Sequence, residues 1–476
     1  MQFDTYIGLE VHAELKTRSK IFCSCPNKFG SPANTNVCPV CMGFPGARPM
    51  LNRQVVLYGV RAGLALDCDI AEFSRMDRKN YFYPDLPKAY QISQAEIPLC
   101  SNGHLDILVD NQLRRIGIER IHIEEDAGKL VHDNGPDTLI DFNRCGVPLI
   151  EVVTRPDMRS SAEAHEFLET LKSVLQFIDV SDCRMEEGSI RCDVNVSLCP
   201  AGSSQLGTRV EMKNINSFSS ALRAIEYETA RQDTLLSAGG IIHQETRKWD
   251  DSRGVSFVMR TKENAADYRF FPEPDLAAIH ITDDIINNER AYIPELPTAK
   301  LLRYTAKFGI PQSEASIIAF DAEKAGLFDE AVNCGRCSPR SICNWIIGDI
   351  TKYLNDSGVG IPDTGITPES LADLGEAVET KVISSSAAKT VLMELLTNGG
   401  SVGEIIRRLD LAQNSDTEYI TSLVEEIISA NQRSVEDYRN GKTNALGYLV
   451  GQCMRRSAGK ADPVEVKRLL NIKLNN

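Results

Sequence analysis

Segments in which hydrophobic and polar residues alternate are frequent in the first part of the chain. Clear examples are residues 7–15, 190–197 and 208–214. Successive side chains of a β-strand point to opposite faces of the sheet, so each segment predicts a half-buried strand. The apolar run 148–154 contains a single acid and predicts a buried strand. We therefore expect this part of the chain to be rich in β-structure.

A further strand is predicted over residues 116–125, and it ends in acidic residues. Its four isoleucines are β-branched, which suits a pleated sheet. Alternation from Ile121 and Ile123 places Glu125 on the apolar face, where an ionised carboxylate requires a cation or hydrogen-bond donors. The simplest interpretation is a strand that ends in a solvated acidic loop. The alternative is that Glu125 points inward and belongs to a functional site.

Helical periodicity replaces this alternation beyond residue 293. Residues 298–400 predict a series of short helices, and residues 405–476 carry hydrophobic residues at helical spacing. The chain of 476 residues is long enough for two to four domains. We expect three domains, with the boundaries 1–293, 294–404 and 405–476.

The composition changes this picture in two ways. At 42% hydrophobic and 25% charged residues, the chain is an ordinary globular protein. Its first residues lack the basic region and the apolar run of a signal peptide, and it has no run of about 18 apolar residues, so we expect a cytoplasmic protein without a membrane partner. The net charge of −14 argues against nucleic-acid binding over the whole surface. Residues 438–476 differ, with eight Lys and Arg against one Asp and one Glu, and they predict a local contact with a polyanion.

Four cysteines near the N-terminus have the spacing of metal ligands. Cys23 and Cys25 form a CxC motif, and Cys38 and Cys41 form a CxxC motif. Four thiolates can close a tetrahedral zinc site, and the intervening residues carry too little apolar surface for a core of their own. We expect a structural zinc site inserted at residues 23–41; the alternative is four free thiols. A second group, expected to be buried thiols on helices, comprises Cys334, Cys337 and Cys343.

The predicted strands also carry carboxylates and one histidine. These residues are Glu10, His12, Glu125, Glu151, Asp193 and Glu211. Oxygen-rich sites favour Mg²⁺, which takes further ligands from water and from phosphates. We expect Glu125 to point inward beside Glu10, His12 and Glu151, whereas Glu124 and Asp126 need not.

A segment that mixes basic and aromatic residues lies at 78–94. Its Lys79, Tyr81 and Lys88 suit contacts with phosphates and bases, but a proline-fixed loop that packs its tyrosines on the core explains the pattern equally well. Lys213 on a predicted strand could neutralise phosphate charge. The chain contains no Walker A loop, so we expect any ATP to bind by other means.

With these motifs assembled, the chain resembles the B-subunit family of the bacterial aspartyl/glutamyl-tRNA amidotransferases. The matching segments run in order along nearly the whole chain. They are IGLEVH from residue 7, NYFYPDLPK from 80, IHIEEDAGK from 121, LIEVV from 149, RCDVNVS from 191, VEMKN from 210, YRFFPEPDL from 268 and LVGQ from 449. The resemblance implies an α+β fold, in which a β-rich mixed-sheet cradle domain precedes an all-α helical domain and a small α-helical tail domain.

The resemblance also implies a function in translation. A member of this family would use ATP and Mg²⁺ to phosphorylate the side-chain carboxylate of Glu or Asp misacylated on tRNA(Gln), tRNA(Asn) or both. Ammonia would come from glutamine through an amidase partner, the A subunit of the same enzyme. A small C subunit would complete a heterotrimeric ligase that forms carbon–nitrogen bonds.

The implied roles can be assigned residue by residue. Catalytic residues would be Glu10, His12, Glu125, Glu151, Asp193 and Glu211. Magnesium ligands would be Glu10, His12, Glu125 and Glu151, and zinc ligands Cys23, Cys25, Cys38 and Cys41. Residues that contact ATP or the substrate would be Lys79, Tyr81, Lys88 and Lys213. The tail residues that contact tRNA would be Lys442, Arg455, Arg456 and Lys460. Two alternatives are a zinc-stabilised tRNA-binding protein without chemistry of its own and a metal-dependent nuclease.

Overall fold

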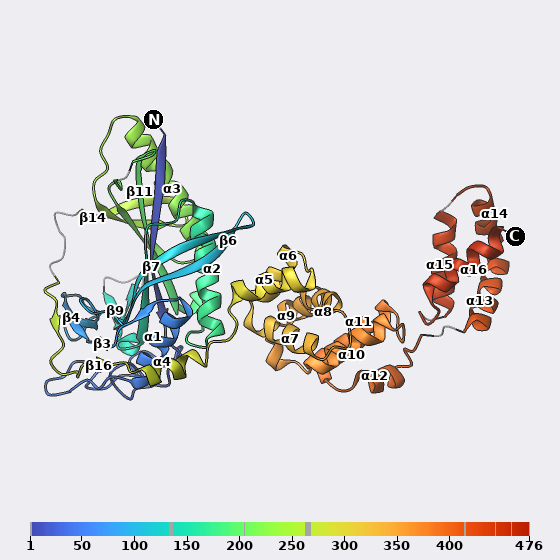
Figure 1. Ribbon diagram of the computed structural model, residues 1–476, viewed down its shortest axis with the longest axis horizontal. Helices are drawn as coiled ribbons and strands as arrows, with labels where there is room; N and C mark the ends of the chain where they lie inside the picture. Colours follow the sequence, from blue (N-terminus) through green and yellow to red (C-terminus); the bar gives the residue numbers. More distant parts are fainter. Residues whose placement is uncertain are drawn as a thin grey trace. The chain divides into compact units, whose positions relative to one another are not determined.

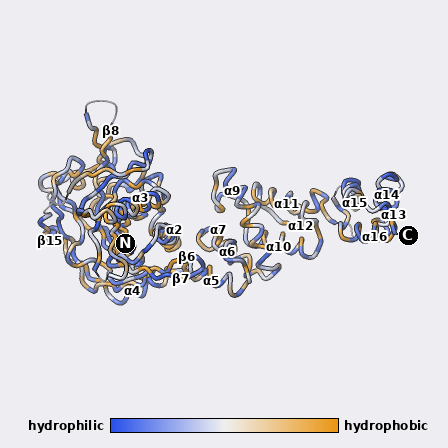
Figure 2. Tube along the Cα trace, turned by 90° about the horizontal axis from the view of Figure 1, so that it is seen from above, coloured by the Kyte–Doolittle hydropathy of each residue, from blue (hydrophilic) through white to orange (hydrophobic). Residues whose placement is uncertain are grey.

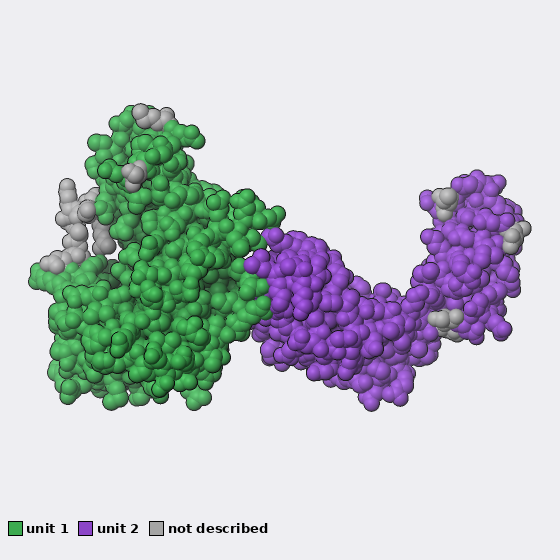
Figure 3. Space-filling model, viewed as in Figure 1, with its two compact units in different colours: residues 1–299 green, residues 300–476 purple. Residues whose placement is uncertain are grey.

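The computed structural model describes residues 2–132, 137–203, 205–261, 268–413, 416–442, 444–457 and 459–475. It divides into two compact units, residues 1–299 and 300–476 (Figure 3). The first unit contains a large mixed sheet with helices, and the second is helical (Figure 1). The predicted α+β fold is confirmed, with the β-rich part first. The division into three domains stays a prediction.

The main sheet of the first unit has nine strands. In spatial order they are β14 (Val255–Thr261), β13 (Glu245–Asp250), β12 (Val210–Ile215), β11 (Ile190–Pro200), β1 (Phe3–Glu14), β10 (Pro148–Thr154), β7 (Gln112–Glu125), β6 (Cys100–Val109) and β2 (Asp69–Ile70). Neighbouring strands are antiparallel except for the parallel pair β12 and β13. The five strands predicted from the sequence are consecutive neighbours: β12, β11, β1, β10 and β7.

Three helices bury the apolar face of this sheet in one hydrophobic core. They are α1 (Arg53–Ala65), α2 (Ser161–Phe177) and α3 (Phe218–Ser237). The sheet contributes alternate residues such as Val11, Ile123 and Val152, which are fully buried. Helix α1 approaches so closely at Gly59 that a Cβ there would lie 2.5 Å from Leu99 Cδ2. This packing commits one face of the sheet to the core, and residues of the opposite parity point to the other face.

Smaller elements complete the first unit. The short strands are β3 (Phe73–Ser74), β4 (Asp77–Asn80), β5 (Tyr90–Ser93), β8 (Lys129–His132), β9 (Thr138–Asp141), β15 (Phe271–Pro272) and β16 (Ile279–His280), and the last helix within this unit is α4 (Asp283–Arg290). Strand β4 pairs with both β5 and β15. The segment 78–94 therefore lies in strands at both of its ends and in a loop between them.

The helices after the first unit are short, as the sequence predicts. They are α5 (Pro297–Phe308), which crosses the boundary, α6 (Gln312–Ala319), α7 (Ala322–Asn333), α8 (Pro339–Trp345), the π-helix Ile346–Ile350, α9 (Thr351–Ser357), α10 (Pro368–Glu379), α11 (Ser385–Asn398), α12 (Val402–Arg408), α13 (Thr417–Ala430), α14 (Gln432–Arg439), α15 (Asn444–Arg456) and α16 (Pro463–Asn475). Residues of α13 to α16 form a hydrophobic cluster of their own, which supports the proposal of a separate tail domain.

The second group of cysteines differs in part from the expectation. Cys343 is buried on α8, but Cys334 and Cys337 are partly exposed. Both lie in the connection between α7 and α8, where Cys334 is the C-cap residue of α7 and Cys337 precedes Ser338, the N-cap residue of α8. The expectation of three buried thiols on helices is therefore wrong for these two, because α7 ends at Asn333, before the CxxC motif begins.

None of the helices in the described part of the chain is both long and apolar enough to cross a membrane. Hydrophilic and hydrophobic positions are intermixed along the trace of both units (Figure 2).

Candidate functional site

Strand register brings residues that are far apart in sequence into one row on the polar face of the sheet. His12 of β1 lies opposite Glu151 of β10, and Glu151 lies opposite His122 of β7. Residues opposite one another in antiparallel strands point to the same face, with Cβ atoms about 4.5–5.5 Å apart. Glu124 follows His122 by two positions and therefore shares this face.

These four residues form a compact group, which we call the imidazole–carboxylate cluster: His12, His122, Glu124 and Glu151. Nε2 of His12 lies 3.5 Å from Glu124 Oε1 and 3.4 Å from Glu151 Oε2. Nε2 of His122 lies 3.6 Å from Glu124 Oε2 and 3.1 Å from Glu151 Oε2. One ligand atom each from His12, Glu124 and Glu151 lie within 4.8 Å of one another, so these three side chains could hold a metal ion.

The geometric expectation for Glu125 is wrong. Glu125 is buried, but it does not lie beside Glu10, His12 and Glu151; its neighbour Glu124 does. The reason is the pleat of the sheet. Glu125 has the parity of Ile121 and Ile123 and points to their face, whereas Glu124 has the parity of His122.

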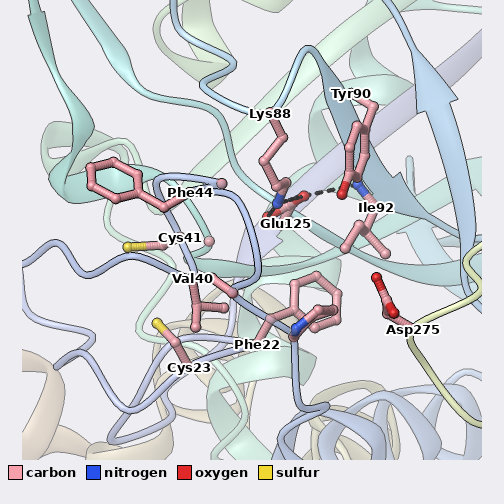
Figure 4. A pocket seen from close by; sticks show the side chains of 14 residues that line it. Phe22, Cys23, Val40, Cys41, Phe44, Lys88, Tyr90, Ile92, Glu125 and Asp275 are labelled. Atoms are coloured by element: carbon pink, nitrogen blue, oxygen red, sulfur yellow. Dashed lines mark hydrogen bonds and ion pairs between the residues drawn. The ribbon is translucent and has the colours of Figure 1, made fainter.

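Glu125 instead pairs with Lys88. Lys88 Nζ donates to both carboxylate oxygens, at 2.5 and 2.6 Å, and the backbone N–H of Ile92 donates to Oε1 at 2.9 Å. Figure 4 shows this pair at a pocket that is also lined by Phe22 and Cys41. The buried carboxylate thus has the cation and the hydrogen-bond donor that its position requires, and Lys88 is engaged in satisfying it.

A second acidic cluster lies beside the first on the same face. It consists of Glu10, Asp193 and Glu211, whose carboxylate oxygens also lie within 4.8 Å of one another. Register explains the grouping, because Glu10 lies opposite Asp193 in β11. Lys213 Nζ forms ion pairs with Asp193 and, at 2.9 Å, with Glu211. Glu10 is two residues from His12 on β1, so the two clusters are about 7 Å apart along the strand.

The electrostatics of both clusters reflect their crowding. Burial, followed by the charge of Glu151, raises the pKa of Glu10. Burial alone would lower the pKa of His122, but its hydrogen bonds with Glu124 and Glu151 raise that pKa to about 9. Burial would raise the pKa of Glu151, yet the hydrogen bonds from both imidazoles lower it. The first cluster therefore favours ionised carboxylates.

Asp126 does not join either cluster. Its carboxylate accepts a hydrogen bond from Arg191 at 2.8 Å and lies 3.4 Å from Arg144. Arg191 is opposite His12 in the sheet, so this ion pair borders the imidazole–carboxylate cluster.

The four N-terminal cysteines converge as the spacing predicts. The Sγ atoms of Cys23, Cys25, Cys38 and Cys41 lie within 4.8 Å of one another. Tetrahedral Zn–S bonds of about 2.3 Å would place the sulfurs about 3.8 Å apart, and Cys38 Sγ lies 3.9 Å from Cys41 Sγ. A hydrogen bond with Cys23 lowers the pKa of the Cys41 thiol to about 5. The arrangement fits a structural metal ion.

The remaining predicted residues lie in different surroundings. Lys79 Nζ lies over the rings of Tyr81 and Tyr268, 5.8 and 5.0 Å from their centroids. In the tail, Lys442 pairs with Asp437, Arg456 with Glu426 and Lys460 with Asp410. Arg455 is exposed and has no ion-pair partner among the described residues.

Sequence reasoning misses three residues of the site. The alternation of β7 draws attention to Glu125 rather than Glu124, and it shows His122 only as part of a strand. The sequence does contain a signal for His122 and Glu124, because both have the parity opposite to that of the isoleucines of β7. The third is Asn195, whose Nδ2 donates to Glu10 at 3.0 Å and whose buried Oδ1 has no hydrogen-bond partner in the described part of the chain.

Comparison with known proteins shows which family the chain belongs to. A family model described as the GatB/GatE catalytic domain matches residues 5–287, and one described as the GatB domain matches residues 326–474. The B subunit of the aspartyl/glutamyl-tRNA(Asn/Gln) amidotransferase of Thermoanaerobacter pseudethanolicus is 49% identical over 475 residues, which is 100% of both chains. The chain belongs to the GatB family. The corresponding B subunit of Caldicellulosiruptor bescii is 51% identical over 478 residues, covering 100% of this chain and 99% of that protein.

Similarity to the GatB family extends over both units. The B subunit of Moorella thermoacetica is 50% identical over 477 residues and also covers 100% of both chains. The family resemblance recognised in the sequence motifs is confirmed. The catalytic-domain match spans β1 to α4 and therefore contains both acidic clusters and the four cysteines.

Proposed function

We propose that this chain is the B subunit of an ATP-dependent, glutamine-hydrolysing tRNA amidotransferase. The γ-phosphoryl group of ATP would pass to a side-chain carboxylate oxygen of Glu-tRNA(Gln), Asp-tRNA(Asn) or both, releasing ADP. Ammonia would then attack the acyl carbon, phosphate would leave, and an amide would remain. The observation that carries the proposal is the pair of adjacent acidic clusters within a domain that matches the family's catalytic domain.

Both clusters have donor sets that suit Mg²⁺. Two carboxylates with one imidazole, or three carboxylates, fit a hard divalent cation. His12, Glu124 and Glu151 would hold one ion, and Glu10, Asp193 and Glu211 would hold another. The buried Oδ1 of Asn195, which lacks a hydrogen-bond partner among the described residues, is a further oxygen donor beside the second cluster. Bound Mg²⁺ would neutralise charge on the transferring phosphoryl group.

Basic residues around the clusters would hold the anionic reactants. Lys213 places its ammonium within the second cluster and could turn toward phosphate oxygens when an ion enters. Lys79, which lies over Tyr81 and Tyr268, offers a cation with two ring faces for ATP or the tRNA end. Lys88 is the weakest candidate for substrate contact, because Glu125 already takes up its charge.

The assembly we propose is the heterotrimer with the amidase (A) and small (C) subunits of the same enzyme, acting in the cytoplasm. The amidase would release ammonia from glutamine.

Zinc bound by the four cysteines would hold residues 23–41 in place, since this segment contains no helix and no long strand.

The test is ADP formation by the reconstituted heterotrimer when misacylated tRNA is added. We expect ADP release that requires Mg²⁺ and misacylated tRNA, followed by amide formation when glutamine is present. Tight tRNA binding without any Mg²⁺-dependent ADP release would instead support a zinc-stabilised tRNA-binding protein without chemistry of its own. Cleavage of the tRNA during incubation with Mg²⁺ would support the nuclease alternative.

We expect Arg455→Ala to weaken tRNA binding several-fold and to reduce the slope of log K against log salt by about 1, because Arg455 is exposed and no acidic side chain in the described residues neutralises it. The measurement is a filter-binding titration between about 50 and 200 mM salt. Lys389→Ala on α11 is the control, since Lys389 is exposed and outside the tail. An unchanged slope for Arg455→Ala would remove Arg455 from the contact.

A further inference from the structure

We propose that His122 is a positioning residue, whose Nε2–H holds the carboxylates of Glu124 and Glu151 in the orientation that accepts a divalent cation. The inference rests on the proposed metal site and extends it to a side chain outside the set of candidate ligands.

The contacts of His122 make this role specific. Its Nε2 is 3.1 Å from Glu151 Oε2 and 3.6 Å from Glu124 Oε2, so one N–H faces both carboxylates. Glu124 has two further neighbours: its Oε2 accepts a hydrogen bond from Ser93 Oγ at 3.2 Å, and its Oε1 lies 3.5 Å from His12 Nε2. The contacts described for the Glu151 carboxylate are to the two imidazoles. Removing His122 would therefore leave Glu151 with His12 alone.

The two imidazoles of the cluster have different surroundings. The His12 side chain is 21% exposed, whereas the His122 side chain is only 5% exposed. His12 shares the set of ligand atoms within 4.8 Å with Glu124 and Glu151, and His122 is outside that set. This difference assigns His12 to the metal and His122 to the carboxylates.

A residue in this place addresses a clear physical problem. Two buried carboxylates that face one ion repel each other, and each can rotate about its last bond unless a donor holds it. Side chains that hold the ligands of a metal in this way commonly change its affinity by about 10–100-fold when they are replaced. Strand pairing fixes His122 opposite Glu151, so its N–H is in place before the ion arrives.

The test measures Mn²⁺ binding to the zinc-loaded, full-length chain by calorimetry, with three variants. His122→Phe keeps a planar ring without an N–H, and we expect its Kd for Mn²⁺ to rise about 10–100-fold. His122→Gln keeps an N–H within reach of the carboxylates, and we expect a Kd within about threefold of wild type. His104→Phe is the matched control, because His104 is on β6 and pairs with Asp67 away from both clusters.

The outcomes separate this inference from the metal site on which it rests. His122→Phe within about twofold of wild type would overturn the inference alone, and so would an equal loss in His122→Gln, because then the N–H would not matter. No Mn²⁺ binding by the wild type would overturn both the inference and the metal site. If His122→Phe fails to fold, His122→Asn takes its place, since its amide is too short to reach both carboxylates. In the heterotrimer, the Mg²⁺ concentration for half-maximal ADP formation should rank the variants in the same order as their Kd for Mn²⁺.

Discussion

Replacing Glu124 by Gln should lower the rate of ADP formation on misacylated tRNA by about 10³-fold, which corresponds to about 4 kcal/mol of transition-state stabilisation. Glu124 is 3.5 Å from His12 and belongs to the set of ligand atoms within 4.8 Å. The amide retains the shape of the side chain but loses its charge, so it should bind a divalent cation poorly. The measurement is single-turnover ADP release by the reconstituted heterotrimer at saturating Mg²⁺.

Two variants on the same strand make the comparison specific. Glu119→Gln carries the identical change at an exposed position of β7 and should be indistinguishable from wild type. Glu125→Gln should act on stability instead, lowering the free energy of unfolding by about 3 kcal/mol because it leaves the buried ammonium of Lys88 without a counter-charge. If Glu125→Gln lost ADP formation and Glu124→Gln kept it, our assignment of the two neighbours would be reversed.

Loss of the bound zinc should have the largest effect on stability. We expect about one zinc per chain, and we expect Cys38→Ser to abolish its binding and lower the Tm by about 10 °C, consistent with a loss of at least about 3 kcal/mol. Residues 23–41 contain no helix. Hydrogen bonds anchor the middle of this segment, such as that from the Asn36 N–H to Asn143 Oδ1 at 2.8 Å, and the four Sγ atoms bring its two ends together. The same segment places Phe22 and Cys41 along the pocket beside Glu125.

Metal analysis and thermal unfolding of purified protein provide the measurement, and limited proteolysis should locate new cleavage within residues 26–37. Cys334→Ser is the matched control, because Cys334 is partly exposed and distant in sequence from the four cysteines. Less than half a zinc per wild-type chain, or an unchanged Tm in Cys38→Ser, would rule out a structural zinc site here.

Several features of the fold were predictable because they depend on local pattern. The strands β1, β11 and β12 follow the alternation of short segments, and β10 follows an apolar run. Helix α2 starts after Ser160, whose side chain accepts a hydrogen bond from the Glu163 N–H. Periodicity and capping are properties of neighbouring residues, so they can be seen without a fold. The CxC and CxxC motifs are local in the same sense, and their sulfurs do converge.

The error over Glu125 and Glu124 has a different origin. The alternation of β7 correctly gave Glu125 the parity of the buried isoleucines, and the alternation of β1 gave Glu10 and His12 the opposite parity to Val11. Neither pattern shows which face of β7 lies on the same side of the sheet as the polar face of β1. Register supplies that link, since His12 lies opposite Glu151 and Glu151 lies opposite His122.

The sequence by itself determined the family, the order of a β-rich part before a helical part, the four cysteines and most members of the two acidic clusters. Only the tertiary structure decided that Glu124 rather than Glu125 faces His12, that Lys88 neutralises Glu125, and that the buried His122 faces Glu151. The physical reason is that pleat parity is fixed within a strand, whereas the meeting of polar faces depends on hydrogen-bond register between strands that lie far apart in the sequence.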